Sequence, residues 1–238
     1  MCGIVGYTGF QDAYDIVING LRRLEYRGYD SAGIVLENKN NVFEVKKTKG
    51  KVSDLEAISE GLQSTSHIGM GHTRWATHGV PSDRNSHPHV SNDGKIALVH
   101  NGIIENYDTI KTMLIGKGFT FLSETDTEVL VNLIQYILDT QNVDFPQAVR
   151  YALNEVYGAY AITVMHKDYP GVLVVGRLGS PLAIGLGDKE YFIASDASPF
   201  VEFTKEAVYL EDGHMATISL ENGVDIRSIK ENEKIEPA

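Results

Sequence analysis

Short apolar segments rich in β-branched residues recur along this sequence and restrict the folds that it can adopt. They lie at residues 3–7, 31–36, 42–45, 96–99, 159–165, 172–175, 182–185, 191–194, 208–210 and 215–218. Glycine, aspartate and proline residues separate them, a pattern that predicts β-strands joined by turns.

Three other segments show the periodicity of amphipathic helices. They cover residues 13–24, residues 129–138 in a helix of about four turns that begins near Thr125, and residues 145–156. The strands fall into two groups with helices outside them. This arrangement predicts two β-sheets packed face to face, with a helical layer on each outer side.

The charge balance narrows the class of protein. Acidic residues number 32 and basic residues 21, which gives a net charge of −11 over 238 residues. This charge argues against a nucleic-acid partner and against an anionic membrane surface. No apolar run reaches transmembrane length and no secretory signal precedes Cys2. We therefore expect a cytoplasmic protein with no membrane partner.

The single cysteine of the chain is its second residue. Removal of Met1 exposes a residue with a thiol nucleophile and a free α-amine, whose reference pKa of about 8 makes it a base near neutral pH. One thiol can build neither a disulfide framework nor a cysteine-rich metal site. The alternative is a buried structural cysteine in the first strand.

Polar side chains are dense in residues 24–33 and 71–79. The first segment joins a helix to a strand, so it is either a loop beside the N-terminal strand or a turn with a surface arginine. In the second, Arg74 can clamp a carboxylate through two parallel hydrogen bonds, and its neighbours can add more. Trp75 can cover a small ligand in a loop that closes as a lid, or it can be a core tryptophan.

Two histidines, His87 and His89, follow in a proline-containing loop. A His-x-His pair is a possible half of a metal site. The sequence offers no clear third ligand, so we expect no metal.

Residues 100–106 (HNGIIEN) follow an apolar strand directly. The side-chain amide of Asn101 and the backbone N–H of Gly102 can converge on one oxyanion, although Asn-Gly is also a common turn. Asp126 has a similar ambiguity. It can bind an ammonium group, or it can take part in capping the helix whose start the spacing of Thr125 and Glu128 indicates.

Six motifs in this order and spacing identify a resemblance. They are CGIVG at 2–6, LEYRGYDSAG at 24–33, GHTRWATHG at 71–79, HPH at 87–89, HNGIIEN at 100–106 and SETDTE at 123–128. The chain resembles, over essentially its whole length, the N-terminal glutaminase domain of the isomerising glutamine–fructose-6-phosphate aminotransferase family. The resemblance implies a class II glutamine amidotransferase of the N-terminal-nucleophile hydrolase type, which is an α+β, four-layer αββα sandwich.

A near relative, the amidophosphoribosyltransferase family, remains the alternative. It typically reads HRGQESAG and GHVRYST where this chain reads YRGYDSAG and GHTRWAT, so the isomerising family is favoured. A catalytically silent binding module is a second alternative, although each catalytic position holds a suitable residue.

The resemblance implies hydrolysis of L-glutamine to glutamate and ammonia. Cys2 attacks the carboxamide to form a thioester, its α-amine carries the proton, and Asn101 and Gly102 hold the oxyanion. Binding roles are also implied: Arg74, Thr77 and His78 at the α-carboxylate, Asp126 and the Gly102 carbonyl at the α-ammonium, Arg27 and Gly28 at the N-terminal cysteine, and Trp75 in the closing loop.

The resemblance also implies a longer protein. Residues 2–220 form the glutaminase domain, and residues 221–238 are a terminal segment and the start of a linker. The linker leads to a C-terminal sugar-isomerase domain, which uses the ammonia to make glucosamine 6-phosphate from fructose 6-phosphate. We expect no cofactor, no metal and a homo-oligomeric full-length protein.

Overall fold

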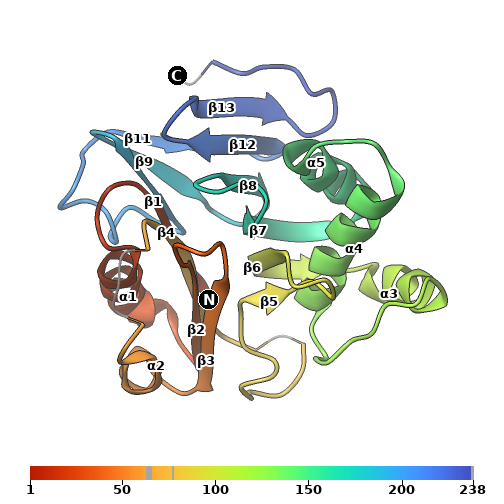
Figure 1. Ribbon diagram of the computed structural model, residues 1–238, viewed down its shortest axis with the longest axis horizontal. Helices are drawn as coiled ribbons and strands as arrows, with labels where there is room; N and C mark the ends of the chain where they lie inside the picture. Colours follow the sequence, from red (N-terminus) through yellow and green to blue (C-terminus); the bar gives the residue numbers. More distant parts are fainter. Residues whose placement is uncertain (63–65, 77, 237–238) are drawn as a thin grey trace.

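The computed structural model describes residues 1–62, 66–76 and 78–236, which form two antiparallel β-sheets between two layers of helices (Figure 1). The first sheet contains, in spatial order, β11 (Ala207–Tyr209), β9 (Ala183–Gly187), β10 (Glu190–Ala194), β1 (Gly3–Thr8), β4 (Ile68–Arg74), β2 (Ser31–Glu37) and β3 (Phe43–Lys49). The second contains β13 (Gly223–Ser228), β12 (His214–Ser219), β8 (Leu173–Leu178), β7 (Gly158–His166), β6 (Ile96–Ile104) and β5 (His89–Val90). The helices are α1 (Ala13–Leu24), the short 3-10 helix η1 (Glu25–Arg27), α2 (Val52–Ser59), α3 (Tyr107–Gly116), α4 (Asp126–Thr140) and α5 (Phe145–Glu155).

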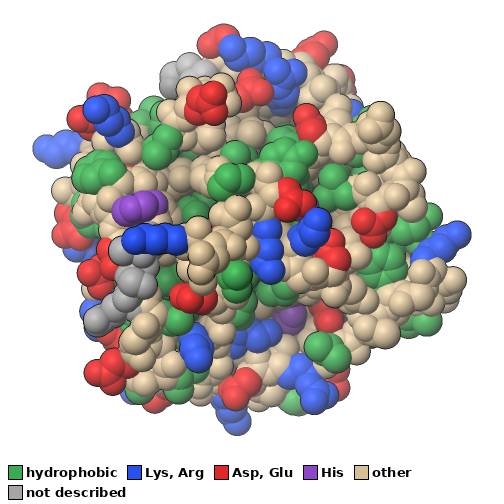
Figure 2. All heavy atoms as spheres, viewed as in Figure 1, with side chains coloured by type: hydrophobic (Ala, Val, Ile, Leu, Met, Phe, Trp, Pro, Cys, Tyr) green, Lys and Arg blue, Asp and Glu red, His purple; other side chains and the backbone are tan. Residues whose placement is uncertain are grey.

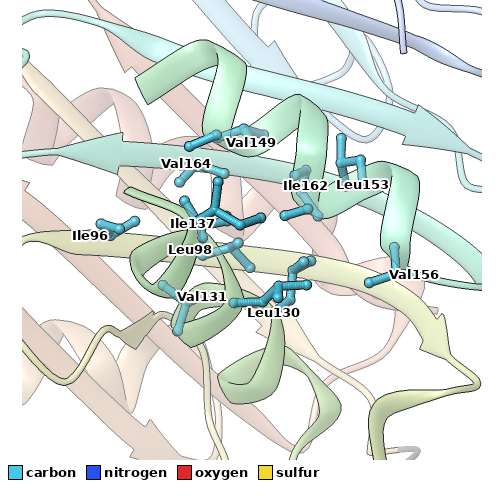
Figure 3. Close-up of a cluster of buried hydrophobic side chains, with 14 of the residues drawn as sticks. Ile96, Leu98, Leu130, Val131, Ile137, Val149, Leu153, Val156, Ile162 and Val164 are labelled. Carbon is cyan, nitrogen blue, oxygen red and sulfur yellow. The ribbon is translucent and has the colours of Figure 1, made fainter. Parts of the chain in front are cut away.

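Three apolar clusters fill the spaces between these four layers. The central cluster joins the two sheets, with Ile4 and Met70 from one and Ala97 and Val175 from the other. A second packs α1 and α2 on the first sheet. The third packs α3, α4 and α5 on the second sheet, where Figure 3 shows side chains of α4 and α5 facing those of β6 and β7. The expected α+β, four-layer αββα sandwich is therefore confirmed.

The helices with the clearest periodicity lie where the sequence predicts them, at α1, α4 and α5. Periodicity does not reveal α2 or α3, because each is short and buries few apolar side chains: Val52 and Leu55 in α2, Ile110 and Leu114 in α3. An amphipathic pattern needs several such residues to stand out.

Strand β4 is also absent from the predicted strands, and it carries Arg74 at its end. Its apolar pattern is broken by Gly69 and Gly71. These glycines face α1, and a Cβ on Gly71 would lie 2.6 Å from a methyl group of Val17. The close approach of helix and strand therefore requires glycine where a strand pattern would place an apolar side chain.

The second sheet extends close to the C-terminal end of the chain. Strand β13 pairs with β12 along its whole length, and Ile226 and Ile229 are buried. Residues 221–238, expected to be a terminal segment and linker, thus include an edge strand. The division into residues 2–220 and 221–238 remains a prediction. Among the described residues, no helix is both long enough and apolar enough to cross a membrane.

Several strand ends meet near the N-terminus, which lies near the middle of the view in Figure 1. Gly3 at the start of β1 pairs with Thr73 near the end of β4, and Ser31 at the start of β2 pairs with Arg74. Both β1 and β4 also contact β6 of the opposite sheet. The antiparallel register therefore brings the polar segments singled out in the sequence to one end of the sandwich.

On the face seen in Figure 2, acidic and basic side chains are interspersed rather than gathered.

Candidate active site

Cys2 lies immediately before β1 and is only partly buried. Its Sγ accepts a hydrogen bond from the backbone N–H of Trp75 at 3.1 Å, and its thiol lies 3.4 Å from the Trp75 carbonyl oxygen. Burial raises the pKa of the Cys2 thiol, and the Trp75 N–H opposes that shift. The thiol is therefore neutral at neutral pH and needs a base before it can act as a nucleophile.

The loop after α1 holds the N-terminal residues. Arg27 donates from Nε to the Cys2 carbonyl oxygen at 3.1 Å, and its Nη1 forms an ion pair with Asp196 at 3.2 Å. Gly28 has φ +101, and a Cβ there would lie 2.8 Å from the Trp75 ring. The connection between α1 and β2, which includes η1, thus lies beside the N-terminal strand, and the turn with a surface arginine is excluded because the Arg27 side chain is buried.

Arg74 is 3% exposed at the end of β4. Its Nη2 donates to the carbonyl oxygens of His78 and Gly79, whereas its Nη1 is buried and has no hydrogen-bond partner among the described residues. Within that part of the chain no carboxylate pairs with it. A buried guanidinium without an anion is costly, so this group favours an anionic ligand.

Asp126 is the first residue of α4 and is 3% exposed. Thr125 caps the helix by accepting from the Glu128 N–H at 3.3 Å, so Asp126 is not needed as the cap. The Asp126 carboxylate instead accepts from the Ile104 N–H at 2.8 Å. Among the described residues, His100 is the one basic side chain within 4.0 Å of this carboxylate. Burial lowers the pKa of His100, so the ring is neutral, and no cation in that part of the chain pairs with Asp126.

Asn101 and Gly102 lie within β6 and not in a turn, because the strand continues to Ile104. Gly102 has φ +122, and a Cβ there would lie 2.1 Å from the carbonyl oxygen of Ala159. Only glycine can adopt this conformation so close to the neighbouring strand. The Asn-Gly pair is therefore explained by strand geometry, which also carries it to the side of Cys2.

The side-chain amide of Asn101 contacts three groups. Its Nδ2 donates to the Cys2 carbonyl oxygen at 3.2 Å and to Ser195 Oγ at 3.1 Å. Its Oδ1 lies 2.8 Å from His72 Nε2. Both amide hydrogens have partners, so binding of an oxyanion requires one of these two long hydrogen bonds to be exchanged.

A cavity of about 460 Å³ opens among these residues, a size typical of small-molecule sites. The predicted residues that line it are Cys2, Arg27, Arg74, Trp75, His78, Asn101, Gly102 and Asp126. Gly28 lies behind the Trp75 ring, and Thr77 falls outside the described residues. Trp75 is 56% exposed and is therefore not a core tryptophan. His87 and Thr125, considered in the sequence as a metal ligand and at a helix start, also line it. The other lining residues have no role in the sequence analysis: Met1, His100, Ile103, Thr127, Ser180 and Pro181.

Sequence reasoning missed three residues that hold the site together. Ser195 accepts from the Ile4 N–H at 2.8 Å as well as from Asn101, and Asp196 holds Arg27. His72 contacts the Asn101 amide. Useful signals were present: Ser195 and Asp196 are polar residues directly after a strand, and His72 shares a face of β4 with Arg74.

His87 and His89 are both buried, and their ring centroids lie 5.1 Å apart. Burial lowers the pKa of each ring well below the usual value. His87 stacks on His72, and His89 Nε2 lies 2.9 Å from Thr125 Oγ1. In residues 1–62, 66–76 and 78–236, no group of three or more His, Cys, Asp or Glu side chains is placed to hold a metal ion.

Comparison with known sequences identifies a matching family and similar proteins. Residues 43–227 match the family described as the glutamine amidotransferase domain. Proteins named glutamine–fructose-6-phosphate aminotransferase (isomerising) are similar: that of Bacteroides thetaiotaomicron is 55% identical over 219 residues and that of Chlorobaculum tepidum 52% identical over 223. Each alignment covers 92% of this chain but only 36% of the relative. The chain thus spans little more than a third of their length.

Solved structures share the fold. The glutamine phosphoribosylpyrophosphate amidotransferase of B. subtilis, complexed with ADP and GMP, superposes with a TM-score of 0.82 at 28% identity, over 97% of this chain and 50% of that one. A glutamine aminotransferase class-II domain protein from Silicibacter pomeroyi gives 0.64 at 16% identity, over 95% and 99%. At that identity the second likeness concerns the fold alone. On the match over residues 43–227, this chain belongs to the glutamine amidotransferase domain family.

Proposed function

We propose that this chain hydrolyses L-glutamine to glutamate and ammonia through a thioester on Cys2. One observation carries the proposal: a single cavity beside the thiol holds a buried cation, Arg74, and a buried carboxylate, Asp126, and neither has a charged partner among the described residues. A free amino acid presents the complementary pair, an α-carboxylate and an α-ammonium. When L-glutamine is held in this way, its side-chain carboxamide extends toward Cys2.

The chemistry follows from this placement. Sγ of Cys2 attacks the carboxamide carbon, which forms the C–S bond of a tetrahedral intermediate, and the C–N bond breaks when this intermediate collapses. The thiol proton leaves with the nitrogen, so the first product is ammonia and the enzyme carries a γ-glutamyl thioester. Water then adds to the thioester carbonyl, the C–S bond breaks, and glutamate and the free thiol are released.

Because the pKa of the Cys2 thiol is raised, a base must remove the thiol proton before Sγ can attack. In the proposed enzyme Met1 has been removed, and the α-amine of Cys2 takes the thiol proton and later delivers it to the departing nitrogen. Arg27 supports this role because its hydrogen bond to the Cys2 carbonyl fixes the backbone that carries the amine.

The tetrahedral intermediate needs donors for its oxyanion. The Asn101 amide lies beside Cys2, and the glycine at position 102 leaves its own N–H unobstructed by a side chain. In this proposal the Asn101 Nδ2–H that contacts the Cys2 carbonyl in the free protein turns to the oxyanion during reaction. Such a donor contributes roughly 2.7–4 kcal/mol to transition-state stabilisation.

A test compares two preparations of the chain whose N-termini are established by intact mass, one beginning at Cys2 and one retaining Met1. We expect glutamate release from the first only, because the peptide bond to Met1 converts the Cys2 amine to an amide that cannot accept a proton. Equal activity in both would refute the role of the amine. Folded protein without activity in either preparation would instead favour the silent binding module.

The relatives suggest a role in a longer protein. Because the chain matches about a third of proteins named for amino transfer from glutamine to fructose 6-phosphate, we propose that its ammonia serves that reaction and yields glucosamine 6-phosphate on a C-terminal sugar-isomerase domain. A cytoplasmic location and a homo-oligomeric full-length protein belong to the same proposal.

Transfer of ammonia to a phosphoribosyl pyrophosphate remains the second candidate, and the 28% identity to the B. subtilis enzyme supports it more weakly than 55% supports the first. An assay of the longer protein with each acceptor separates the two. Stimulation of glutamine hydrolysis by fructose 6-phosphate is the expected result, and stimulation by phosphoribosyl pyrophosphate alone would reverse the assignment.

A further inference from the structure

The side-chain amide of Asn101 has two possible orientations, which exchange its oxygen and its nitrogen. Only one of them presents an N–H donor toward Cys2; the other presents a carbonyl oxygen, which would repel an oxyanion. Whatever selects the orientation therefore decides whether the residue can assist catalysis. On the side away from Cys2, the amide contacts His72 at 2.8 Å.

The partners of His72 determine its hydrogen position. Its Nε2 lies 3.0 Å from the backbone carbonyl oxygen of His100 and 2.8 Å from the Asn101 side chain. A carbonyl oxygen can only accept, so Nε2 carries the hydrogen. The Asn101 atom that faces this N–H must then be the acceptor Oδ1, which turns Nδ2 toward the Cys2 carbonyl and Ser195.

The surroundings of His72 keep this donor in place. The side chain is fully buried and its ring stacks on His87, with centroids 4.1 Å apart and an interplanar angle of 11°. Its Nδ1 has no hydrogen-bond partner within the described part of the chain, so no acceptor there competes for the ring hydrogen. Burial lowers the pKa of His72 to about 3, and the ring stays neutral at any pH where a thiol enzyme works.

We propose that His72 is a positioning residue that sets the orientation of the Asn101 amide, so that Nδ2 and not Oδ1 faces Cys2. His72 does not line the cavity and does not touch the substrate; it acts through Asn101. The inference rests on the proposed glutamine hydrolysis and adds to it the origin of a correctly turned oxyanion donor.

The test uses two substitutions of similar volume. His72→Gln retains an amide N–H at about the position of Nε2, whereas His72→Met has no donor. We expect kcat for L-glutamine to fall up to ~10²-fold in His72→Met with KM nearly unchanged, and His72→Gln to recover most of that loss. Equal kcat in the two variants, with both folded by thermal melting, would overturn the proposal.

A double-mutant cycle separates positioning from a general structural effect. In an Asn101→Ala background no amide remains to be oriented, so His72→Met should reduce kcat by less than about two-fold further. A full additional loss would show that His72 acts on something other than Asn101. His166→Met is the matched control, because His166 is a buried histidine at the far end of β7; it should lower the melting temperature without changing kcat.

A measurement on the unsubstituted chain covers the case in which His72→Met fails to fold. The ¹⁵N shifts of the His72 ring, assigned by their loss in His72→Gln, should report a neutral ring with hydrogen on Nε2. Hydrogen on Nδ1 or a charged ring at neutral pH would refute the proposal. Unsubstituted protein that starts at Cys2 but does not hydrolyse glutamine would instead refute the proposed function, whatever the ring reports.

Discussion

Buried polar side chains lie beside both ends of strand β1, and the two groups differ in how completely their members are paired. At the far end, the Tyr7 hydroxyl donates to Glu190 at 2.7 Å, and Gln11 donates to Tyr7 through its backbone and to Glu190 through its side chain. At the near end, Arg74 and Asp126 keep buried charges without charged partners in the described residues. Paired groups stabilise the fold, whereas unpaired charges that line a cavity are candidates for ligand binding.

This difference predicts that substitutions at the near end change activity more than stability, and that the far end behaves in the opposite way. The thiol should give the largest effect. Cys2→Ala should lower glutamine hydrolysis by roughly 10⁴-fold or more with an almost unchanged melting temperature, since no other cysteine is present. Turnover near that of the unsubstituted chain would remove Cys2 from the mechanism.

The oxyanion donor should give the next largest effect. Asn101→Ala should reduce kcat by roughly 10²–10³-fold with little change in KM, because the donor matters most in the transition state. Steady-state kinetics on folded protein decides the matter. A normal kcat with a lower melting temperature would mean that Asn101 only ties β6 to Cys2.

Arg74→Lys should act chiefly on binding, because lysine cannot form the two parallel hydrogen bonds of a guanidinium. We expect KM for L-glutamine to rise on the order of ten-fold with a smaller change in kcat. Substrate analogues sharpen this test. 4-Aminobutanamide lacks the α-carboxylate, and its disadvantage relative to glutamine should shrink in Arg74→Lys. Glutaramate lacks the α-ammonium, and its disadvantage should not shrink, which makes it the control.

Glu37 tests the limits of the comparison, because it is a buried carboxylate at the far end of β2 whose oxygens have no hydrogen-bond partner in the described residues. Burial raises its pKa to about 7, from 4.5. The folded state therefore favours the protonated form, and stability falls as pH rises from about 4.5 to 7. Glu37→Gln should raise stability at pH 8 by about 1–3 kcal/mol, leave it unchanged near pH 4, and not affect kcat. Denaturant melts at the two pH values check the sign, and a loss of activity would give Glu37 a functional role.

The paired cluster should give the smallest effect. Tyr7→Phe removes one hydroxyl while Gln11 still donates to Glu190, so stability should fall by about 1 kcal/mol and kinetics should not change. Chemical denaturation and a glutaminase assay on the same preparation measure both quantities. A change in kcat that, expressed as a free energy, exceeds the change in the free energy of unfolding would contradict the assignment of the two ends.

The sequence by itself determined the elements with strong patterns and the identity of half of the residues that line the cavity. Helices α1, α4 and α5 have enough buried residues for a local pattern to reveal them. The motifs around Cys2, Arg74 and Asn101 contain residues that line one cavity, and they could be recognised because motif order and residue chemistry do not depend on three-dimensional contacts.

Only the tertiary structure decided which groups are paired and which are free. The glycines of β4 interrupt its apolar pattern, and Gly71 packs against a helix that is distant in sequence, so no local pattern predicts this strand. The Asn101–Gly102 pair reads locally as a turn, and only the carbonyl of Ala159 on β7 shows why a strand needs glycine there. His72 and Ser195 lie 29 and 94 residues from Asn101, so their hydrogen bonds to it arise from sheet packing that no local pattern contains.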